Sequence, residues 1–445
     1  MSTAVCEPAR VQENEIPVVT GLAKLATARF AGLDVRETYQ ELADQLSRDD
    51  TNVAPLMDIA ILDQLVGSQE RGLAVQAAAL RAQRIFRLAS DRPRSRLTLL
   101  GFAMAGPLSA NIPVEFLIED SDVSLILLYI VPGAPLPPIP DHDLAIVLAA
   151  ESDTARPALA EIERLTAHWP RPVLDRPELV PLLGRESLYQ LMAGVPGIEI
   201  PPTARVDCAA LAAIGAGSMP LIAALPYGTS RSALPVARHE TADVQRVPAD
   251  PQGSRPDSLP FPIIVRPIDS HGGKGLVRLS STDEISAYMV DNPAGEYFLS
   301  PFVDYRSPDG LFRKYRIAVI DGEPYPSHLA ISSHWMIHFL NAGMTECEAK
   351  RREEERFMDQ FREDFAARHG AAFQEMADRS GLEYFGVDCG ETRDAKLLVF
   401  ESDTSLIVHN MDSPSLFPYK GPHMNRLFQA FREMLYRKAE LGPSG

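Results

Sequence analysis

The sequence has little that would mark a secreted, membrane-spanning or nucleic-acid-binding protein. Its 445 residues include only four cysteines, none in a C-x-x-C pair, so we expect reduced thiols in a cytoplasmic protein. The N-terminus lacks the basic start and apolar core of a signal peptide. The longest apolar runs, such as 125–131 and 144–150, are too short to cross a bilayer. Because the formal net charge is -17, no general attraction to nucleic acid or anionic membranes is expected.

The composition is that of a globular protein, with 45% hydrophobic and 23% charged residues. The length predicts two or three domains, which we assign to 1–92, 93–180 and 181–445. Apolar residues within 53–86 recur at helical spacing on both sides of Gly67, which predicts a tetratricopeptide-like helix pair. Since one pair cannot build a solenoid, a helical cap is favoured over a peptide-binding array, and a protein partner for this region stays open.

The second segment alternates short strand-like and helical runs. Strands are expected at 97–103, 125–131, 144–150 and 172–174, with helices at 114–118 and 155–168. This alternation predicts an α/β domain with a parallel sheet.

The third segment mixes strands and helices. Residues 224–260 are rich in proline, glycine and serine, and this irregular insertion is either a lid or disordered. Asp321-Gly322 lies between two strand-like runs and predicts a hairpin. A long charged helix is expected at 349–380, followed by paired strands at 384–389 and 396–400.

The first chemical signal is a strand that delivers Arg266 and then turns through a glycine-rich segment. The members of this segment are Ser270, His271, Gly272, Gly273, Lys274 and Gly275. Glycines let backbone N–H groups approach phosphate oxygens, and a fixed cation neutralises phosphate charge. A glycine-rich turn without a ligand is the alternative.

The second signal is a set of carboxylates at the ends of two neighbouring strands. Asp388 ends one strand and Glu401 the next, while Asp403 shares the face of Glu401. Three converging oxygen ligands suit Mg²⁺. The alternative is three solvated acids.

The third signal is a strand on which Lys314 and Arg316 point to the same side. Two neighbouring cations repel each other unless an anion joins them, and a nucleotide or an acyl phosphate would do so. The alternative is a solvated basic strand face.

Together and in this order, the three signals resemble the ATP-grasp superfamily over about 97–437. The branch that looks most similar contains glutathione synthetase and the ligases that add glutamate to ribosomal protein. With the helix pair and the histidine-rich stretch 328–341, the chain also resembles bacterial tetratricopeptide/ATP-grasp proteins. The resemblance implies a helical N-terminal cap, a parallel-sheet pre-ATP-grasp domain, and an ATP-grasp fold of two α+β subdomains.

The resemblance also implies a ligand set. ATP would lie between the two subdomains, with Mg²⁺ or Mn²⁺ held by Asp388, Glu401 and, in place of an asparagine, Asp403. Arg266 and Arg185 would replace two phosphate-binding lysines. The adenine would meet the backbone at Ser300, Phe302 and Val303. Candidate substrate-binding residues are His328, His334, His338, Asn341 and His409.

The activity that the resemblance implies is ATP-dependent ligation of a carboxylate and an amine through an acyl phosphate. Arg316, with Lys314 as the second candidate, would stabilise the transferred group. The co-substrates would be small molecules or peptides, and the enzyme is expected to be a homodimer. A nucleotide-binding scaffold, favoured by the replacements of lysine and asparagine, and a phosphotransferase are the alternatives.

Overall fold

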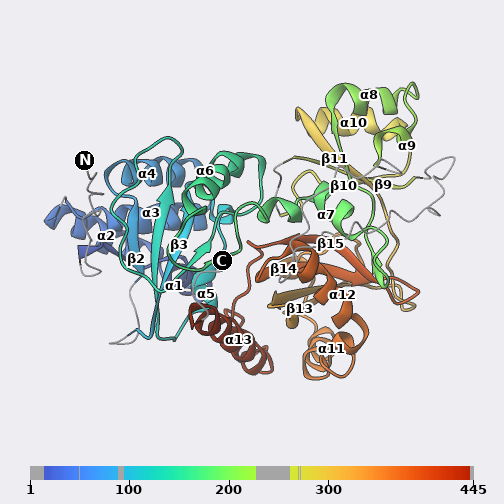
Figure 1. Cartoon of the computed structure of the whole chain (residues 1–445). Helices are drawn as coiled ribbons and strands as arrows, with labels where there is room; N and C mark the ends of the chain where they lie inside the picture. Colours follow the sequence, from blue (N-terminus) through green and yellow to red (C-terminus); the bar gives the residue numbers. More distant parts are fainter. Residues whose placement is uncertain are drawn as a thin grey trace. The chain divides into compact units, whose positions relative to one another are not determined.

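The computed structural model describes residues 15–49, 51–88, 95–226, 261–268, 270 and 272–440. The chain forms two compact units (Figure 1). The first comprises Met1–Val180, Leu382–Gly386 and Asp403–Gly445, and the second comprises Pro181–Gly381 and Val387–Ser402. The sequence-based division places all residues after 180 in one domain, whereas the chain returns to the first unit near its end. Most of the insertion expected at 224–260, and His271, lie outside the described residues.

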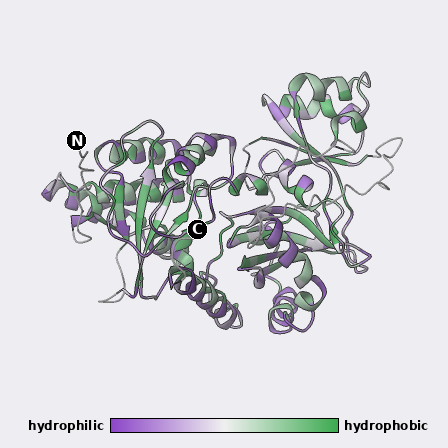
Figure 2. Ribbon diagram, viewed as in Figure 1, coloured by the Kyte–Doolittle hydropathy of each residue, from purple (hydrophilic) through white to green (hydrophobic). Residues whose placement is uncertain are grey.

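The first unit is built on a six-stranded sheet of order β1-β2-β4-β3-β5-β6. Its strands are β1 (Val18–Val19), β2 (Ile85–Leu88), β3 (Leu97–Met104), β4 (Val123–Ile130), β5 (Leu144–Val147) and β6 (Val173–Leu174). The strands β4, β3, β5 and β6 run parallel, as predicted. Every residue of β4 and β5 is buried, and the strands of this sheet are drawn mainly in the green of hydrophobic residues in Figure 2. Such runs are typical of parallel strands covered on both faces.

The helices of the first unit include the predicted pair. They are α1 (Leu22–Phe30), α2 (Val35–Arg48), α3 (Ala54–Leu65), α4 (Gln69–Ala82), α5 (Val114–Leu117), α6 (Arg156–Thr166) and α13 (Lys420–Glu440). Gly67, with φ of 86°, lies in the turn between α3 and α4. No described helix is long and apolar enough to cross a membrane.

One prediction in this unit is wrong. The helical pattern was expected to extend through Ile85, but 85–88 form β2, which pairs with β4 in antiparallel register. Ile85 and Phe86 are buried there, and a β-branched and an aromatic side chain favour a strand. The N-terminal region therefore contributes to the same sheet as the segment that follows it.

The second unit contains a four-stranded antiparallel sheet of order β10-β9-β11-β8. The strands are β8 (Ala204–Asp207), β9 (Ile263–Pro267), β10 (Val277–Leu279) and β11 (Glu296–Pro301), and the helices are α8 (Cys208–Gly215), α9 (Leu221–Ala224) and α10 (Asp283–Asp291). In Figure 1, α8 and α10 lie over this sheet. Leu211, Ile214, Ile285 and Tyr288 from these helices form a core with Val265 of β9.

A second, five-stranded sheet has the order β13-β12-β14-β15-β7. Its strands are β7 (Ile198–Glu199), β12 (Phe312–Ile320), β13 (Glu323–Ser332), β14 (Tyr384–Glu391) and β15 (Leu397–Asp403), and its helices are α7 (Arg185–Met192), α11 (Glu348–Asp359) and α12 (Phe365–Ser380). The β12–β13 hairpin turns at Asp321 and Gly322, whose φ values of 49° and 82° are those of the predicted tight turn. Two sheets with separate helices confirm the mixed α/β fold.

The long helix expected at 349–380 is two helices, α11 and α12. The break between them lets Phe357 and Phe365 pack on the same Tyr315 ring, with ring centroids 4.9 Å and 4.7 Å away. Helical periodicity continues through the break in the sequence, so the pattern alone did not reveal it.

Candidate functional site

Two cations of β12 meet one buried carboxylate of β14. Arg316 donates from Nε to Asp388 Oδ1 at 2.8 Å and from Nη2 to Oδ2 at 2.9 Å. Lys314 Nζ lies 2.6 Å from Asp388 Oδ2. Asp388 is fully buried, whereas the side chains of Lys314 and Arg316 are 16% and 18% exposed. The cations therefore reach from a buried anion towards the surface of the unit.

The charge balance at Asp388 is set by these neighbours. Burial alone would raise the pKa of Asp388, but the charges of Arg316 and Lys314 outweigh it and hold the pKa well below its usual value. Two cations share one anion, so this group has a surplus of positive charge.

An irregularity in the β12–β13 ladder accompanies this arrangement. Arg316 pairs with His328, but Ile317 pairs with Pro326, so Ser327 is an extra residue in β13. A bulge of this kind changes which side chains share a face of the sheet. Here it lies at Arg316 itself.

A second ion pair lies beside the first. Arg185, at the start of α7, pairs with Glu401 of β15 and donates to the Phe400 carbonyl at 3.4 Å. Burial opposes the charge of Glu401, but Arg185, with smaller contributions from Lys314 and Arg266, keeps its pKa below the usual value. The charges of Lys314, Arg266 and Asp388 all act on Glu401, so the two ion pairs belong to one site.

Arg266 contributes a further positive charge to this site. It donates from Nε to Ser270 Oγ at 3.1 Å, and no carboxylate among the described residues forms an ion pair with it. Burial, together with the nearby charge of Arg185, lowers the pKa of Arg266 to about 10. A guanidinium in such surroundings is still charged at neutral pH and is stabilised by an added anion.

The glycine-rich segment follows Arg266, and three of its glycines have left-handed backbone conformations. Gly272, Gly273 and Gly275 have φ values of 62°, 76° and 68°, which favour glycine over residues with a Cβ. Lys274 is exposed. Successive backbone N–H groups in such a turn can bind an anion.

The segment contacts His338, which lies in the loop after β13 of the second sheet. A Cβ added to Gly273 would lie 2.6 Å from His338 Nε2 and 3.3 Å from Met336 Sδ. His338 lies near the charges of Lys314, Asp388, Glu401 and Arg316. The glycine-rich segment and the two ion pairs thus form one candidate site.

Replacement of Gly273 by alanine is expected to weaken anion binding by the glycine-rich segment about tenfold. The left-handed backbone costs an alanine about 1–2 kcal/mol, and its Cβ would displace His338. Binding measured by calorimetry tests this. Gly370→Ala in α12 is the control, because a Cβ there meets nothing within 4 Å. Equal affinity of Gly273→Ala and the natural protein would contradict the expectation.

The chain is similar to several solved structures. A RimK domain ATP-grasp protein from Sphaerobacter thermophilus matches 76% of this chain and 99% of its own, with 14% identity and a TM-score of 0.40. A D-alanine–D-alanine ligase from Bacillus anthracis, complexed with ATP, matches 78% and 99%, with 12% identity and a TM-score of 0.41. The VanG D-Ala:D-Ser ligase from Enterococcus faecalis matches 78% and 100%, with 11% identity and a TM-score of 0.42.

No protein-family model matches the chain, and no curated protein matches it either.

The three carboxylates predicted to bind Mg²⁺ are engaged separately. Asp388 is bound by two cations, Glu401 by Arg185, and Asp403 accepts the Ser405 N–H at 2.9 Å in the first unit. Within the part of the chain that the structure describes, no group of three histidine, cysteine, aspartate or glutamate side chains is placed to hold a metal ion. The metal set stays a prediction.

The candidate substrate histidines separate in space. His328 packs on Phe339 with ring centroids 4.8 Å apart, and His334 is exposed. His409 lies in the first unit, with its ring centroid 6.2 Å from that of Phe116. Among the described candidates, His328 is paired with Arg316 along the ladder, and His338 lies near the charges of Lys314, Asp388, Glu401 and Arg316. Asn341 Oδ1 accepts the backbone N–H of His338 at 3.1 Å.

The strand expected to meet adenine continues β11. Ser300 is half-buried in β11, Val303 follows it in a loop, and the Phe302 N–H donates to the Pro262 carbonyl at 3.0 Å. The Phe302 ring lies edge-on to Trp335, with centroids 5.6 Å apart.

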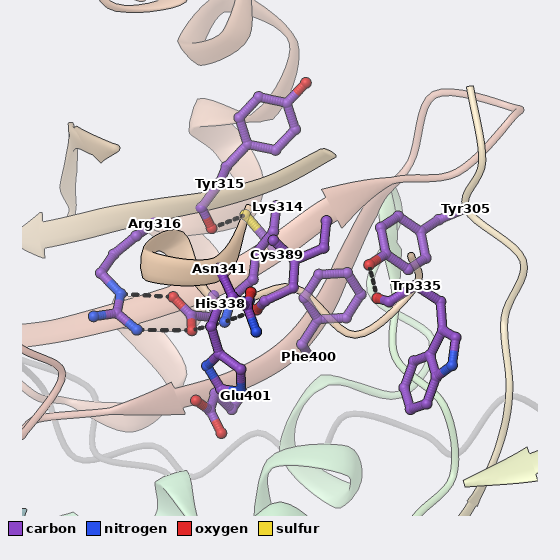
Figure 3. Close-up of polar contacts among 12 residues, drawn as sticks. Tyr305, Lys314, Tyr315, Arg316, Trp335, His338, Asn341, Cys389, Phe400 and Glu401 are labelled. Atoms are coloured by element: carbon purple, nitrogen blue, oxygen red, sulfur yellow. Dashed lines mark hydrogen bonds and ion pairs between the residues drawn. The ribbon is translucent and has the colours of Figure 1, made fainter. Parts of the chain in front are cut away.

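The sequence analysis missed the aromatic group beside these charges. Tyr305 packs on Phe400 with centroids 4.9 Å apart, and its hydroxyl donates to the Trp335 carbonyl at 2.5 Å. In Figure 3 the Phe400 ring lies between Tyr305 and Trp335 on one side and Lys314 and Glu401 on the other. Since Tyr305, Trp335 and Phe400 are far apart in the sequence, no short motif could have predicted that they pack together.

Proposed function

We propose that the second unit binds ATP and uses it to join a carboxylate to an amine, as an ATP-grasp-type ligase acting on a small molecule or peptide. The observation that supports this most directly is Arg266, a charged side chain without a carboxylate partner among the described residues, placed at the start of a glycine-rich turn. A nucleotide phosphate would supply the missing anion.

In the first step, a substrate carboxylate oxygen attacks the γ-phosphorus of ATP. The bond to the β,γ-bridging oxygen breaks, and ADP leaves with its electron pair. Arg316 and Lys314, oriented by Asp388, stabilise the negative charge of the transferring phosphoryl group. Arg266 and Arg185 bind the remaining phosphates.

In the second step, the nitrogen of a free amine attacks the carbonyl carbon of the acyl phosphate. The carbon–oxygen bond to phosphate breaks, phosphate leaves, and the nitrogen loses one proton to solvent. Arg316 stays paired with the departing phosphate. No side chain needs to form a covalent bond with the substrate.

The predicted Mg²⁺ does not fit the side chains as they are arranged. Both oxygens of Asp388 accept hydrogen bonds from Arg316, and Oδ2 also forms an ion pair with Lys314. These two cations would repel a divalent ion placed beside Asp388. No step above therefore relies on a metal.

The test is ADP release from ATP, measured with panels of amino acids and peptides and read by mass spectrometry for the amide. ADP release that needs both a carboxylate and an amine is the expected result. Tight ATP binding without turnover would indicate a nucleotide-binding scaffold and contradict the ligase proposal. A stable phosphorylated product formed with one co-substrate would indicate a phosphotransferase.

The homodimer, a protein partner for the N-terminal helices and a cytoplasmic location are separate proposals. Light scattering of the purified chain tests the dimer directly.

A further inference from the structure

His338 places an unsatisfied polar atom inside the candidate site. Its Nε2 is buried and has no hydrogen-bond partner among the described residues. A buried ring nitrogen without a partner is costly, and such atoms often indicate a missing ligand. Figure 3 shows His338 next to Asn341 and Glu401, in the group that contains Lys314 and Arg316.

The side of the ring opposite Nε2 is occupied by the short helix η5 (Phe339–Asn341). His338 and Asn341 form a reciprocal cap: the Asn341 side chain accepts the His338 N–H at 3.1 Å, and the Asn341 N–H, which donates to the His338 carbonyl at 3.1 Å, also faces the His338 ring. A backbone N–H facing the ring favours an unprotonated Nδ1. In a neutral ring the proton is then on Nε2.

The surroundings of His338 also favour the neutral ring. Burial, and then the charge of Lys314, lower its pKa, with a further contribution from Arg316, while Asp388 and Glu401 act in the opposite direction. At neutral pH the ring is therefore uncharged. It can donate one hydrogen bond from Nε2 without adding a further cation to the site.

Nε2 points at the glycine-rich segment. The 2.6 Å between Nε2 and a Cβ built on Gly273 means that ring and backbone are in contact. An anion that accepts hydrogen bonds from the N–H groups of this segment is thus also within reach of Nε2.

We propose that His338 donates a hydrogen bond from Nε2 to a phosphate oxygen of a nucleotide held by residues 272–275 of the glycine-rich segment. An anionic oxygen only accepts, so His338 acts as a donor and serves neither as a proton acceptor nor as a metal ligand. It connects the phosphate-binding segment on one sheet with the Lys314–Arg316–Asp388 group on the other. This inference rests on the proposed ATP binding and adds a residue to it.

The experiment compares ATP affinity in the natural protein with that of His338→Ala and His338→Gln, by calorimetry. Loss of a hydrogen bond to a charged group is expected to weaken binding about 10- to 100-fold in the alanine variant. Glutamine carries an N–H donor at a position similar to Nε2, so it should recover most of that loss. His168→Ala, at an exposed histidine of the first unit, is the control for loss of an imidazole.

The outcomes separate the two proposals. If the natural protein does not bind ATP, the proposed function fails. If it binds ATP and His338→Ala binds equally well, the inference about His338 fails alone. If glutamine is as weak as alanine, the donor role is wrong.

A second measurement does not depend on activity. Nitrogen-15 NMR of the histidine rings at pH 7.5 should show His338 neutral with its proton on Nε2, and its Nε2 signal should shift on addition of ATP. A proton on Nδ1, or an unchanged signal with bound ATP, would overturn the proposal.

Discussion

Asp388→Asn is expected to lower ATP turnover about 100- to 1000-fold, a loss comparable to removal of a preorganised charge-stabilising group. It is also expected to lower the free energy of unfolding by about 3–5 kcal/mol, because breaking a buried ion pair leaves uncompensated charge. Asparagine keeps the shape of the side chain but cannot balance Arg316 and Lys314, whose nearest contacts to Asp388 are 2.8 Å and 2.6 Å. Denaturant unfolding and a coupled ADP assay measure the two effects.

The control for this change is Asp394→Asn. Asp394 lies on the turn between β14 and β15, and its side chain is 65% exposed, so its replacement should change stability by no more than about 0.5 kcal/mol. A similar loss of stability in Asp388→Asn and Asp394→Asn would show that any change in this hairpin destabilises the fold.

The pH dependence of the stability difference follows from the lowered pKa of Asp388. A depressed pKa means that the carboxylate stabilises the fold above its unfolded pKa of about 3.9, and that this contribution is lost as the pH falls through the lower folded value. The difference between the natural protein and Asp388→Asn should thus be constant from about pH 5 to 8. A difference that changes across this range would contradict the ion-pair assignment.

Glu401→Ala is expected to reduce ATP turnover at least about 100-fold while the protein stays folded. The Glu401 side chain is 31% exposed, so its removal should cost about 1 kcal/mol or less of stability. Its charge balances Arg185 and acts on Arg266 and Lys314, and without it these cations repel one another. Steady-state ADP release and thermal unfolding test both parts.

Glu199→Ala is the matched control for Glu401. Glu199 lies on β7 and pairs with Lys396, and its side chain is 39% exposed, so turnover should be unchanged. Unchanged turnover in Glu401→Ala would remove Glu401 from the site. A Mg²⁺ titration of Glu401→Gln addresses the predicted metal role: a raised Mg²⁺ requirement would support it, and an unchanged requirement would contradict it.

Local patterns were sufficient to predict the parts of the site that lie on single strands. The alternation of side chains along β12 placed Lys314 and Arg316 on one side, and the glycine spacing after Arg266 predicted the open turn. Each prediction needed only the geometry of a few consecutive residues. The parallel strands of the first unit were predicted from their apolar runs for the same reason.

What could not be predicted is the pairing between distant segments. Arg316 and Asp388 are 72 residues apart, and the neighbouring positions of β12 and β14 follow from tertiary packing. β2 was missed because its strand conformation depends on pairing with β4.

The extra residue Ser327 sets which face of β13 lies beside the charged group. On the far side of the bulge, His328 and Ala330 pair with Arg316 and Lys314, whereas on the near side Pro326 and Tyr325 pair with Ile317 and Ala318. A regular ladder that kept every residue of β13 would shift the register beyond Pro326 by one residue and exchange the two faces of that half of the strand. The buried Leu329 and Ile331 would then lie on the face of Lys314 and Arg316. The bulge therefore keeps the apolar residues of β13 off the face that carries the charged group.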